Sequence, residues 1–149
     1  MFADRTDAGE QLADRLEQRG VETDVVLAVP RGGLPLGRVV ADRLDAPLDV
    51  VVAKKMGAPH NPELAIGAVG ADGSAWVNDA IVARVGADDD YVETERERKA
   101  EEAREKADLY REGKPVPELE GQRVLVVDDG VATGATTIAC LRQVENAGA

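Results

Sequence analysis

The stretch RVLVVDDGVATGATT, residues Arg123 to Thr137, decides the fold. The apolar run from Arg123 to Val127 predicts a buried strand, and the strand ends in two carboxylates, Asp128 and Asp129. A turn of small residues follows, and the periodic apolar positions after it predict a helix. A strand that passes through a tight glycine-containing turn into a helix is one unit of an α/β fold.

Two further apolar runs repeat this pattern earlier in the chain. Asp24 to Pro30 and Leu48 to Lys55 predict buried strands. A predicted helix comes before each of them: Asp7 to Arg19 before the first strand and Pro35 to Leu44 before the second. The spacing of Asp7 and Glu10 fits a capping box at the start of the first helix. The alternation predicts an α/β fold with a mainly parallel sheet of about four strands flanked by helices.

The middle of the chain carries different signals. Met56 to Leu64 contains two prolines, a glycine and an asparagine, which predicts a loop. A short hairpin is expected around residues 71–73, and a short helix is expected over Asp79 to Val85. Asp88 to Glu112 predicts a long charged helix, in which Glu95–Lys99 and Glu102–Lys106 are i,i+4 pairs. Three alanines and Tyr110 form a thin apolar stripe along it: Ala100, Ala103, Ala107 and Tyr110. Residues 113–121 are expected to be a linker.

The segment after the last strand has the chemistry of a sugar-phosphate site. A helix N-terminus that follows a glycine-rich loop binds anions through free backbone N–H groups. The two carboxylates would repel a bare phosphate, but they would accept hydrogen bonds from neighbouring sugar hydroxyls. The candidate phosphate-binding residues are consecutive: Gly130, Val131, Ala132, Thr133, Gly134, Ala135 and Thr136. The spacing matches neither a Walker A loop nor a dinucleotide fingerprint.

Two more segments lie at predicted strand ends, where ligands bind in parallel sheets. Arg31, Gly32 and Gly33 follow the first strand, so a guanidinium fork and two glycine N–H groups are available to an anion. Lys54 and Lys55 end the second strand, and because side chains alternate along a strand we expect only one of them to face a ligand. The sequence does not decide between the two lysines.

Composition excludes several classes of function. The net charge is −11, from 29 acidic and 18 basic residues, which argues against general nucleic-acid binding and against anionic membranes. A single cysteine and a single histidine exclude cysteine-rich and histidine-based metal clusters. We therefore expect a cytoplasmic protein whose acidic surface reflects either a halophilic source or ordinary solubility.

Arg123 to Thr137 resembles the phosphoribosyl pyrophosphate motif of the type I phosphoribosyltransferases. VPRGG is similar to the pyrophosphate loop of that family, which often contains a non-proline cis peptide bond. The longer pattern of VPRGGLPLG, KKMGAPHNPELAIGAV and VDDGVATGAT resembles one uncharacterised group within the family. The resemblance implies a Rossmann-like phosphoribosyltransferase fold over residues 1–149, with residues 88–112 as a charged helical insertion.

The resemblance also implies roles for these residues. Asp128 and Asp129 would hold the ribose, residues 130–136 the 5-phosphate, and Arg31, Gly32, Gly33 and one lysine the pyrophosphate. The implied activity, within nucleotide metabolism, transfers the phosphoribosyl group of phosphoribosyl pyrophosphate to a nitrogenous base. Mg²⁺ would be held mainly by the ligand. The position of Ala132 is acidic in hypoxanthine–guanine enzymes, which counts against that subclass. Adenine-type enzymes resemble this chain in having alanine there, but one position does not set the base specificity.

The family sheet usually continues beyond this point into a further strand and a hood near the base. In this sequence no such segments follow the last predicted helix. The sequence therefore supports binding of the ligand more strongly than catalytic activity. The alternative is a regulatory domain that binds phosphoribosyl pyrophosphate or a nucleotide without catalysis. The strand Arg123 to Val127 would be an apolar sheet edge, which a second copy of the chain could cover.

Overall fold

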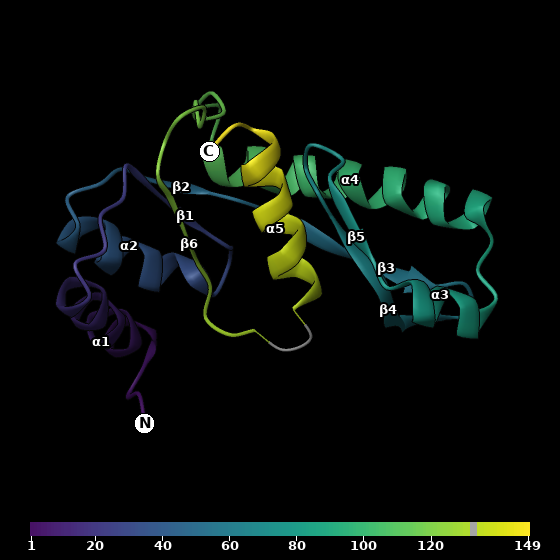
Figure 1. The fold of residues 1–149 in the computed structure, drawn as a ribbon, viewed down its shortest axis with the longest axis horizontal. Helices are drawn as coiled ribbons and strands as arrows, with labels where there is room; N and C mark the ends of the chain where they lie inside the picture. Colours follow the sequence, from purple (N-terminus) through teal and green to yellow (C-terminus); the bar gives the residue numbers. More distant parts are fainter. Residues whose placement is uncertain (132–133) are drawn as a thin grey trace.

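The computed structural model describes residues 1–131 and 134–149, and it has a parallel sheet with helices on both faces (Figure 1). The order of its strands is β2 (Leu48–Val50), β1 (Val25–Ala28) and β6 (Val124–Val127), all parallel. The α/β class is as predicted, but the parallel sheet has three described strands instead of about four. β6 lies at an edge of this sheet, as expected from its place in the sequence.

The central strand β1 is buried on both faces because helices cover each side. Val26 packs with α1 (Arg5–Gln18) and α2 (Gly33–Arg43) in one core cluster. Val25 and Leu27 pack on the opposite side with Cys140 of α5 (Ala135–Asn146). This arrangement explains why the strand is a continuous apolar run instead of an alternating one.

A second, antiparallel sheet was not predicted in this form. It contains β3 (Ala53–Ala58), β4 (Asn61–Gly70) and β5 (Ala75–Val77), in that order. The predicted strand Leu48 to Lys55 is in fact two strands, because the chain leaves the parallel sheet at Val51 and Val52. The hairpin expected around residues 71–73 is confirmed as the connection of β4 to β5.

The predicted loop Met56 to Leu64 is also wrong: β3 and β4 continue through it as a tight hairpin in which Ala58 pairs with Asn61. Gly57 sits at a register shift of this hairpin, and a Cβ there would lie 2.8 Å from the carbonyl oxygen of Pro62. Pro62 is tolerated because β5 pairs only with residues 67–69 of β4, which leaves the outer edge of β4 unpaired at Pro62.

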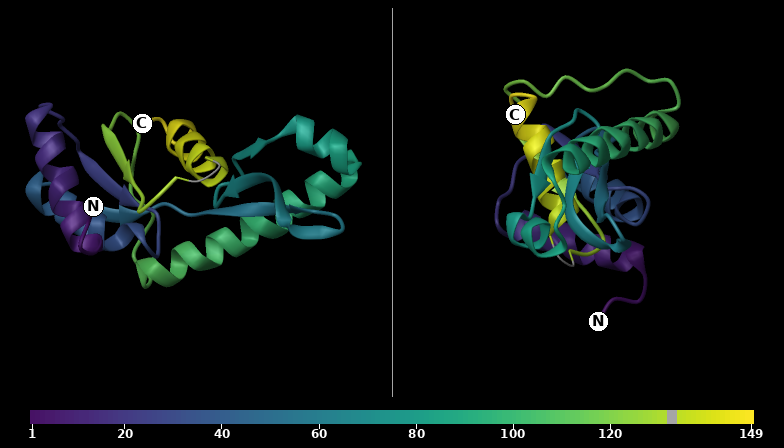
Figure 2. Two further views of the ribbon diagram at one scale, coloured as in Figure 1. Left: turned by 90° about the horizontal axis from the view of Figure 1, so that it is seen from below. Right: turned by 90° about the vertical axis from the view of Figure 1, so that its right-hand side faces the viewer.

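The long charged helix is confirmed as α4 (Asp89–Arg111), and the short helix before it as α3 (Asp79–Val85). α4 lies along the antiparallel sheet and reaches the parallel sheet at its C-terminal end (Figure 2). There Arg111 donates hydrogen bonds to the Asp49 carboxylate and the Val50 carbonyl, both at 3.0 Å. The alanine stripe of α4 is buried, which fixes the helix against the sheet.

Three local details of the helices differ from the predictions. The N-cap of α1 is Asp4, whose carboxylate accepts from the backbone N–H of Asp7 at 2.7 Å, so the capping residue is not Asp7. In α4, Glu95 pairs with Arg98 at i,i+3 instead of with Lys99. Glu102 pairs with Lys99 at 3.1 Å, which leaves Lys106 for another contact described below.

Candidate functional site

The loops after β1 and β6 meet at one edge of the parallel sheet. Ala28 pairs with Val127, and the N–H of Val29 donates to the Val127 carbonyl at 2.9 Å. A Cβ on Gly33 would lie 2.8 Å from that same carbonyl oxygen, and a Cβ on Gly32 would overlap the Asp129 carboxylate. The two glycines are therefore where the two loops touch, and the structure brings together segments that are far apart in sequence.

The loop that carries Arg31 is held from α4. The Pro30–Arg31 peptide bond is cis, the form that the resemblance leads one to expect. Lys106 of α4 donates to the Pro30 carbonyl at 3.4 Å. The exposed Arg31 guanidinium hydrogen-bonds to the Tyr110 side chain, which raises the pKa of Arg31 above its usual value. The guanidinium stays charged and stays accessible to an anion.

The two carboxylates at the end of β6 differ in their electrostatics. Burial raises the pKa of Asp128, and the neighbouring Asp129 carboxylate adds to the rise. Asp129 has a lowered pKa, chiefly because Arg5 donates to its Oδ2 atom through Nε at 3.1 Å and Nη2 at 2.9 Å. The backbone N–H of Asp129 donates to Asp128 Oδ1 at 2.8 Å. The pair is thus one half-buried acid next to one ionised, partnered acid.

The predicted phosphate-binding loop runs from Gly130 to the first turn of α5. Gly130 and Val131 are exposed, Gly134 is the N-cap with φ of 88°, and Thr136 is half-buried. Ala135 is buried against Ala68 of β4, which fixes the start of α5 on the antiparallel sheet. Ala132 and Thr133 lie outside the described residues. The described part of the loop therefore has an exposed strand end and a helix N-terminus that begins at a left-handed glycine.

Lys54 and Lys55 do not end a strand of the parallel sheet, which corrects the prediction. Both lie inside β3, where Lys54 pairs with Val69 and Lys55 with Ala68 of β4. Lys54 is half-buried and Lys55 exposed, in line with the alternation of a strand. The residue before these two lysines, Ala53, packs against the cluster that contains Ala135 at the start of α5.

Sequence reasoning missed Arg5, Lys106 and Tyr110. Lys106 had been assigned to a surface pair within its helix, and Tyr110 only to an apolar stripe. Arg5 belongs to no motif, and its contact with Asp129 depends on how α1 packs beside β6. Only the tertiary arrangement places these side chains at the site.

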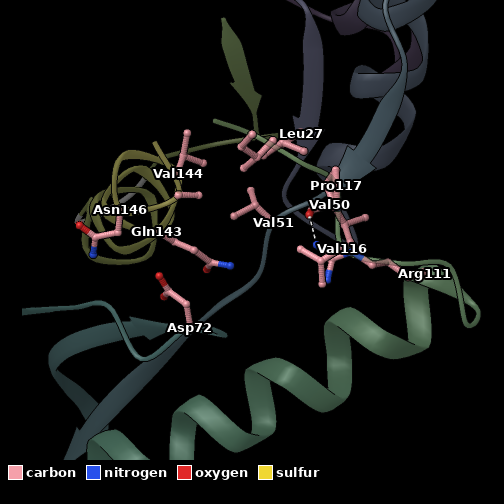
Figure 3. Close-up of a pocket in the computed structure, with 12 residues that line it drawn as sticks. Leu27, Val50, Val51, Asp72, Arg111, Val116, Pro117, Gln143, Val144 and Asn146 are labelled. Carbon is pink, nitrogen blue, oxygen red and sulfur yellow. Dashed lines mark hydrogen bonds between the residues drawn. The ribbon is translucent and has the colours of Figure 1, made fainter. Parts of the chain in front are cut away.

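A cavity of about 560 Å³ opens beside the acidic pair. Its walls are Phe2, Asp4 and Arg5 near the N-terminus, Ala8 and Leu12 of α1, Leu36 of α2, and the two carboxylates. A second cavity of about 280 Å³ lies elsewhere, between α5, the linker 113–121 and the parallel sheet (Figure 3). Leu27, Val51 and Val144 make much of its wall apolar, and its described lining contains none of the predicted site residues.

Acidic and histidine side chains do not form a metal cage in the part of the chain that the structure describes. Two adjacent carboxylates with waters and ligand oxygens suit Mg²⁺, which keeps several waters and needs few protein ligands. The residues present therefore fit a magnesium ion that is held mostly by a phosphorylated ligand. Among residues 1–131 and 134–149, no helix has the length and apolar character to span a membrane.

Comparison with known families decides the relationship. A family model described as the phosphoribosyl transferase domain matches residues 4–149. The chain belongs to the phosphoribosyltransferase family. Within this family, it is 44% identical over 136 residues to Mycobacterium tuberculosis H37Rv "Putative phosphoribosyl transferase Rv0571c", and equally to its counterpart in strain CDC 1551. The match covers 91% of this chain and 31% of each relative, so the chain spans less than a third of their length.

Two solved structures share the fold of this chain. TT1426 from Thermus thermophilus superposes with a TM-score of 0.78 and 44% identity, covering 99% of this chain and 70% of that one. A purine phosphoribosyltransferase from Pyrococcus horikoshii gives a TM-score of 0.54 at 20% identity, covering 97% of this chain and 67% of that one. The second likeness shows a shared phosphoribosyltransferase fold and nothing more.

Proposed function

We propose that this chain transfers the 5-phosphoribosyl group of phosphoribosyl pyrophosphate to a nitrogenous base and releases pyrophosphate. The observation that carries the proposal is the contact of Gly32 and Gly33 with the end of β6. It puts an anion-binding loop with an exposed arginine beside two carboxylates, which are followed by a helix N-terminus. A sugar that carries hydroxyls, a 5-phosphate and a pyrophosphate needs these three features side by side.

Each group has a chemical part in the reaction. Asp128 and Asp129 accept hydrogen bonds from the ribose hydroxyls and hold the ring. Residues 130–136 bind the 5-phosphate through backbone N–H groups at the start of α5. As the bond from the anomeric carbon to the pyrophosphate oxygen breaks, positive charge develops on the sugar ring and negative charge on the leaving group.

The leaving pyrophosphate is stabilised by the loop after β1. Arg31 and the Gly32 N–H group neutralise its charge, with Lys54 or Lys55 as a further cation. The Gly33 N–H, which the sequence also assigned to the anion, donates instead to the Val29 carbonyl at 2.9 Å. Mg²⁺, which Asp128 and Asp129 could help to hold, would supply charge neutralisation for the pyrophosphate. The bond that forms joins the anomeric carbon to a nitrogen of the base, and the proton that this nitrogen loses passes to the pyrophosphate or to water.

The first experiment is calorimetric titration with phosphoribosyl pyrophosphate, with and without Mg²⁺, at low and high salt. We expect Mg²⁺-dependent binding, followed by pyrophosphate release when a suitable base is added. Binding without release from any of a panel of bases would favour the non-catalytic regulatory alternative. Absence of binding by the folded chain would contradict both functions.

Two variants test the assignment of groups. Asp129→Asn should weaken binding of ribose 5-phosphate while the fold stays intact. Arg31→Ala should weaken binding of pyrophosphate more than that of ribose 5-phosphate, and equal losses would refute the separate pyrophosphate subsite. Arg38→Ala is the matched control, because Arg38 pairs with Asp42 on the exposed surface of α2.

A further inference from the structure

Among the described residues, none of those proposed to bind phosphate or pyrophosphate lines the cavity beside the acidic pair. Its volume of about 560 Å³ lies within the range of small-molecule sites, roughly 300–1,000 Å³. Asp128 and Asp129 form one part of its wall, and Phe2, Asp4 and Arg5 of the N-terminal segment form the part next to them. A group attached to a ribose that is held by these carboxylates can therefore extend into this cavity.

The N-terminal wall contains the chain's single phenylalanine. Phe2 lines the cavity and is 58% exposed, so its ring is not committed to the core. Apolar surface from Ala8, Leu12 and Leu36 continues the wall behind it. An exposed aromatic ring beside a sugar-binding pair can stack on the face of a planar heterocycle.

Arg5 links this wall to the sugar site. In the structure both Nε and Nη2 of Arg5 donate to Asp129 Oδ2, so the guanidinium occupies the carboxylate that the sugar hydroxyls would use. The Arg5 side chain is 60% exposed and can turn when hydroxyls replace it. A guanidinium only donates hydrogen bonds, so once released into the cavity it complements an acceptor such as an oxo group.

We propose that residues 2–5 form the acceptor subsite, where Phe2 stacks on a planar nitrogen heterocycle and Arg5 donates to an oxo group on its edge. This inference rests on the proposed function, because it takes the ribose position from the acidic pair. It names a substrate class, oxo-substituted heterocyclic bases in preference to amino-substituted ones, and two residues that select it.

The test compares nucleotides with the bare sugar phosphate. Calorimetry measures Kd for ribose 5-phosphate and for two matched pairs, inosine and adenosine 5′-monophosphate, and uridine and cytidine 5′-monophosphate. Within each pair an oxo group replaces an amino group, and we expect the oxo member to bind more tightly. Ribose 5-phosphate alone reports on the proposed function, so failure of the wild-type chain to bind it would overturn that function separately.

Two variants separate the roles of the wall. Phe2→Ala should weaken every nucleotide by on the order of tenfold and leave ribose 5-phosphate binding unchanged. Arg5→Ala should remove the preference for the oxo member of each pair, while ribose 5-phosphate binds as well as before or more tightly, because Asp129 is freed. Leu109→Ala, an exposed apolar residue on α4, is the control for general surface effects.

The proposal fails on any of three results. Nucleotide affinity that Phe2→Ala leaves unchanged would remove the stacking role. An equal loss of nucleotide and ribose 5-phosphate affinity in Phe2→Ala would indicate a general disturbance of the site. An oxo preference that survives Arg5→Ala would show that another group selects the base. Thermal midpoints of all variants establish that each is folded.

Discussion

The substitution Gly33→Ala tests whether the contact between the two loops positions the acidic pair. The added Cβ would lie 2.8 Å from the Val127 carbonyl oxygen and 3.2 Å from Asp128 Cα, and both are backbone atoms. Ordinary contact begins at 3.4 Å, so the end of β6 must move by about half an ångström or more. Overpacking of this kind costs about 1–3 kcal/mol of folding free energy.

In the proposed complex, the same movement would displace the carboxylates from the sugar. A misplacement of about 1 Å costs roughly a hundredfold in a catalytic site, so half of that should weaken ribose 5-phosphate binding on the order of tenfold. Urea unfolding gives the stability and calorimetry gives the affinity.

Gly37→Ala is the matched control, because it lies one turn further along α2 and its Cβ would also meet a neighbour at 2.8 Å. That neighbour is the Ala28 side chain, away from the acidic pair. Gly37→Ala should lose comparable stability but keep its affinity. Equal affinity losses in both variants, or none in Gly33→Ala, would refute the argument that this contact sets the carboxylate position.

Three further predictions concern stability. Glu95→Ala should lower the free energy of unfolding by about 1–3 kcal/mol in urea, because it leaves the buried N–H of Gly57 without its 2.8 Å acceptor. Glu95→Gln keeps an acceptor and should recover most of this loss. Equal losses in the two variants would contradict the role of that hydrogen bond. Asp128→Asn should raise the thermal midpoint at pH 7, because a pKa raised by burial means that ionisation of Asp128 destabilises the folded state. This gain should vanish as the pH falls to about 4, and a gain independent of pH would exclude the electrostatic cause. Arg43→Ala removes ion pairs to three carboxylates of α1 and should lower the free energy of unfolding at low salt, and by less in about 1 M salt. A loss that does not change with salt would point to packing.

The parallel sheet could be predicted because its signals are local. Val25 to Ala28 and Val124 to Val127 are apolar runs bounded by turn residues, and burial on both faces leaves no alternation to misread. The ends of α3 and α4 were also predictable, since Asn78, Gly86 and Asp88 are capping residues whose effect depends on their own turn.

The start of α1 shows why a local pattern can still mislead. Asp4 to Asp7 and Asp7 to Glu10 have the same three-residue spacing, so the pattern fits a cap at either position. The structure selects Asp4, and this choice extends the helix toward Asp129. A helix that is predicted to begin one turn too late does not include Arg5, the first residue of α1, so Arg5 was not predicted to lie at the site.

The second sheet could not be predicted because it depends on long-range pairing. Leu48 to Lys55 contains no glycine or proline, and nothing within it signals the change of partner at Val51 and Val52. Gly57 and Pro62 are typical of loops, yet a bulge and an unpaired strand edge accommodate both in a hairpin. The same long-range packing brings Arg5 to Asp129, a contact between residues 124 positions apart.

The edge position of β6 has a consequence for the order in which the molecule is made. Val25 pairs with Val124, so closing this pair requires a loop that contains most of the other elements, and such pairing is entropically costly and slow. During synthesis, the segments of α1, α2 and the hairpin of β3 and β4 are made before the strand that carries the acidic pair. The proposed sugar site is therefore completed only after β6 has been made and has paired with β1. A ligand that bridges β1 and β6 binds only the completed fold, so its presence shifts the folding equilibrium toward that state and protects the newly made chain from proteolysis.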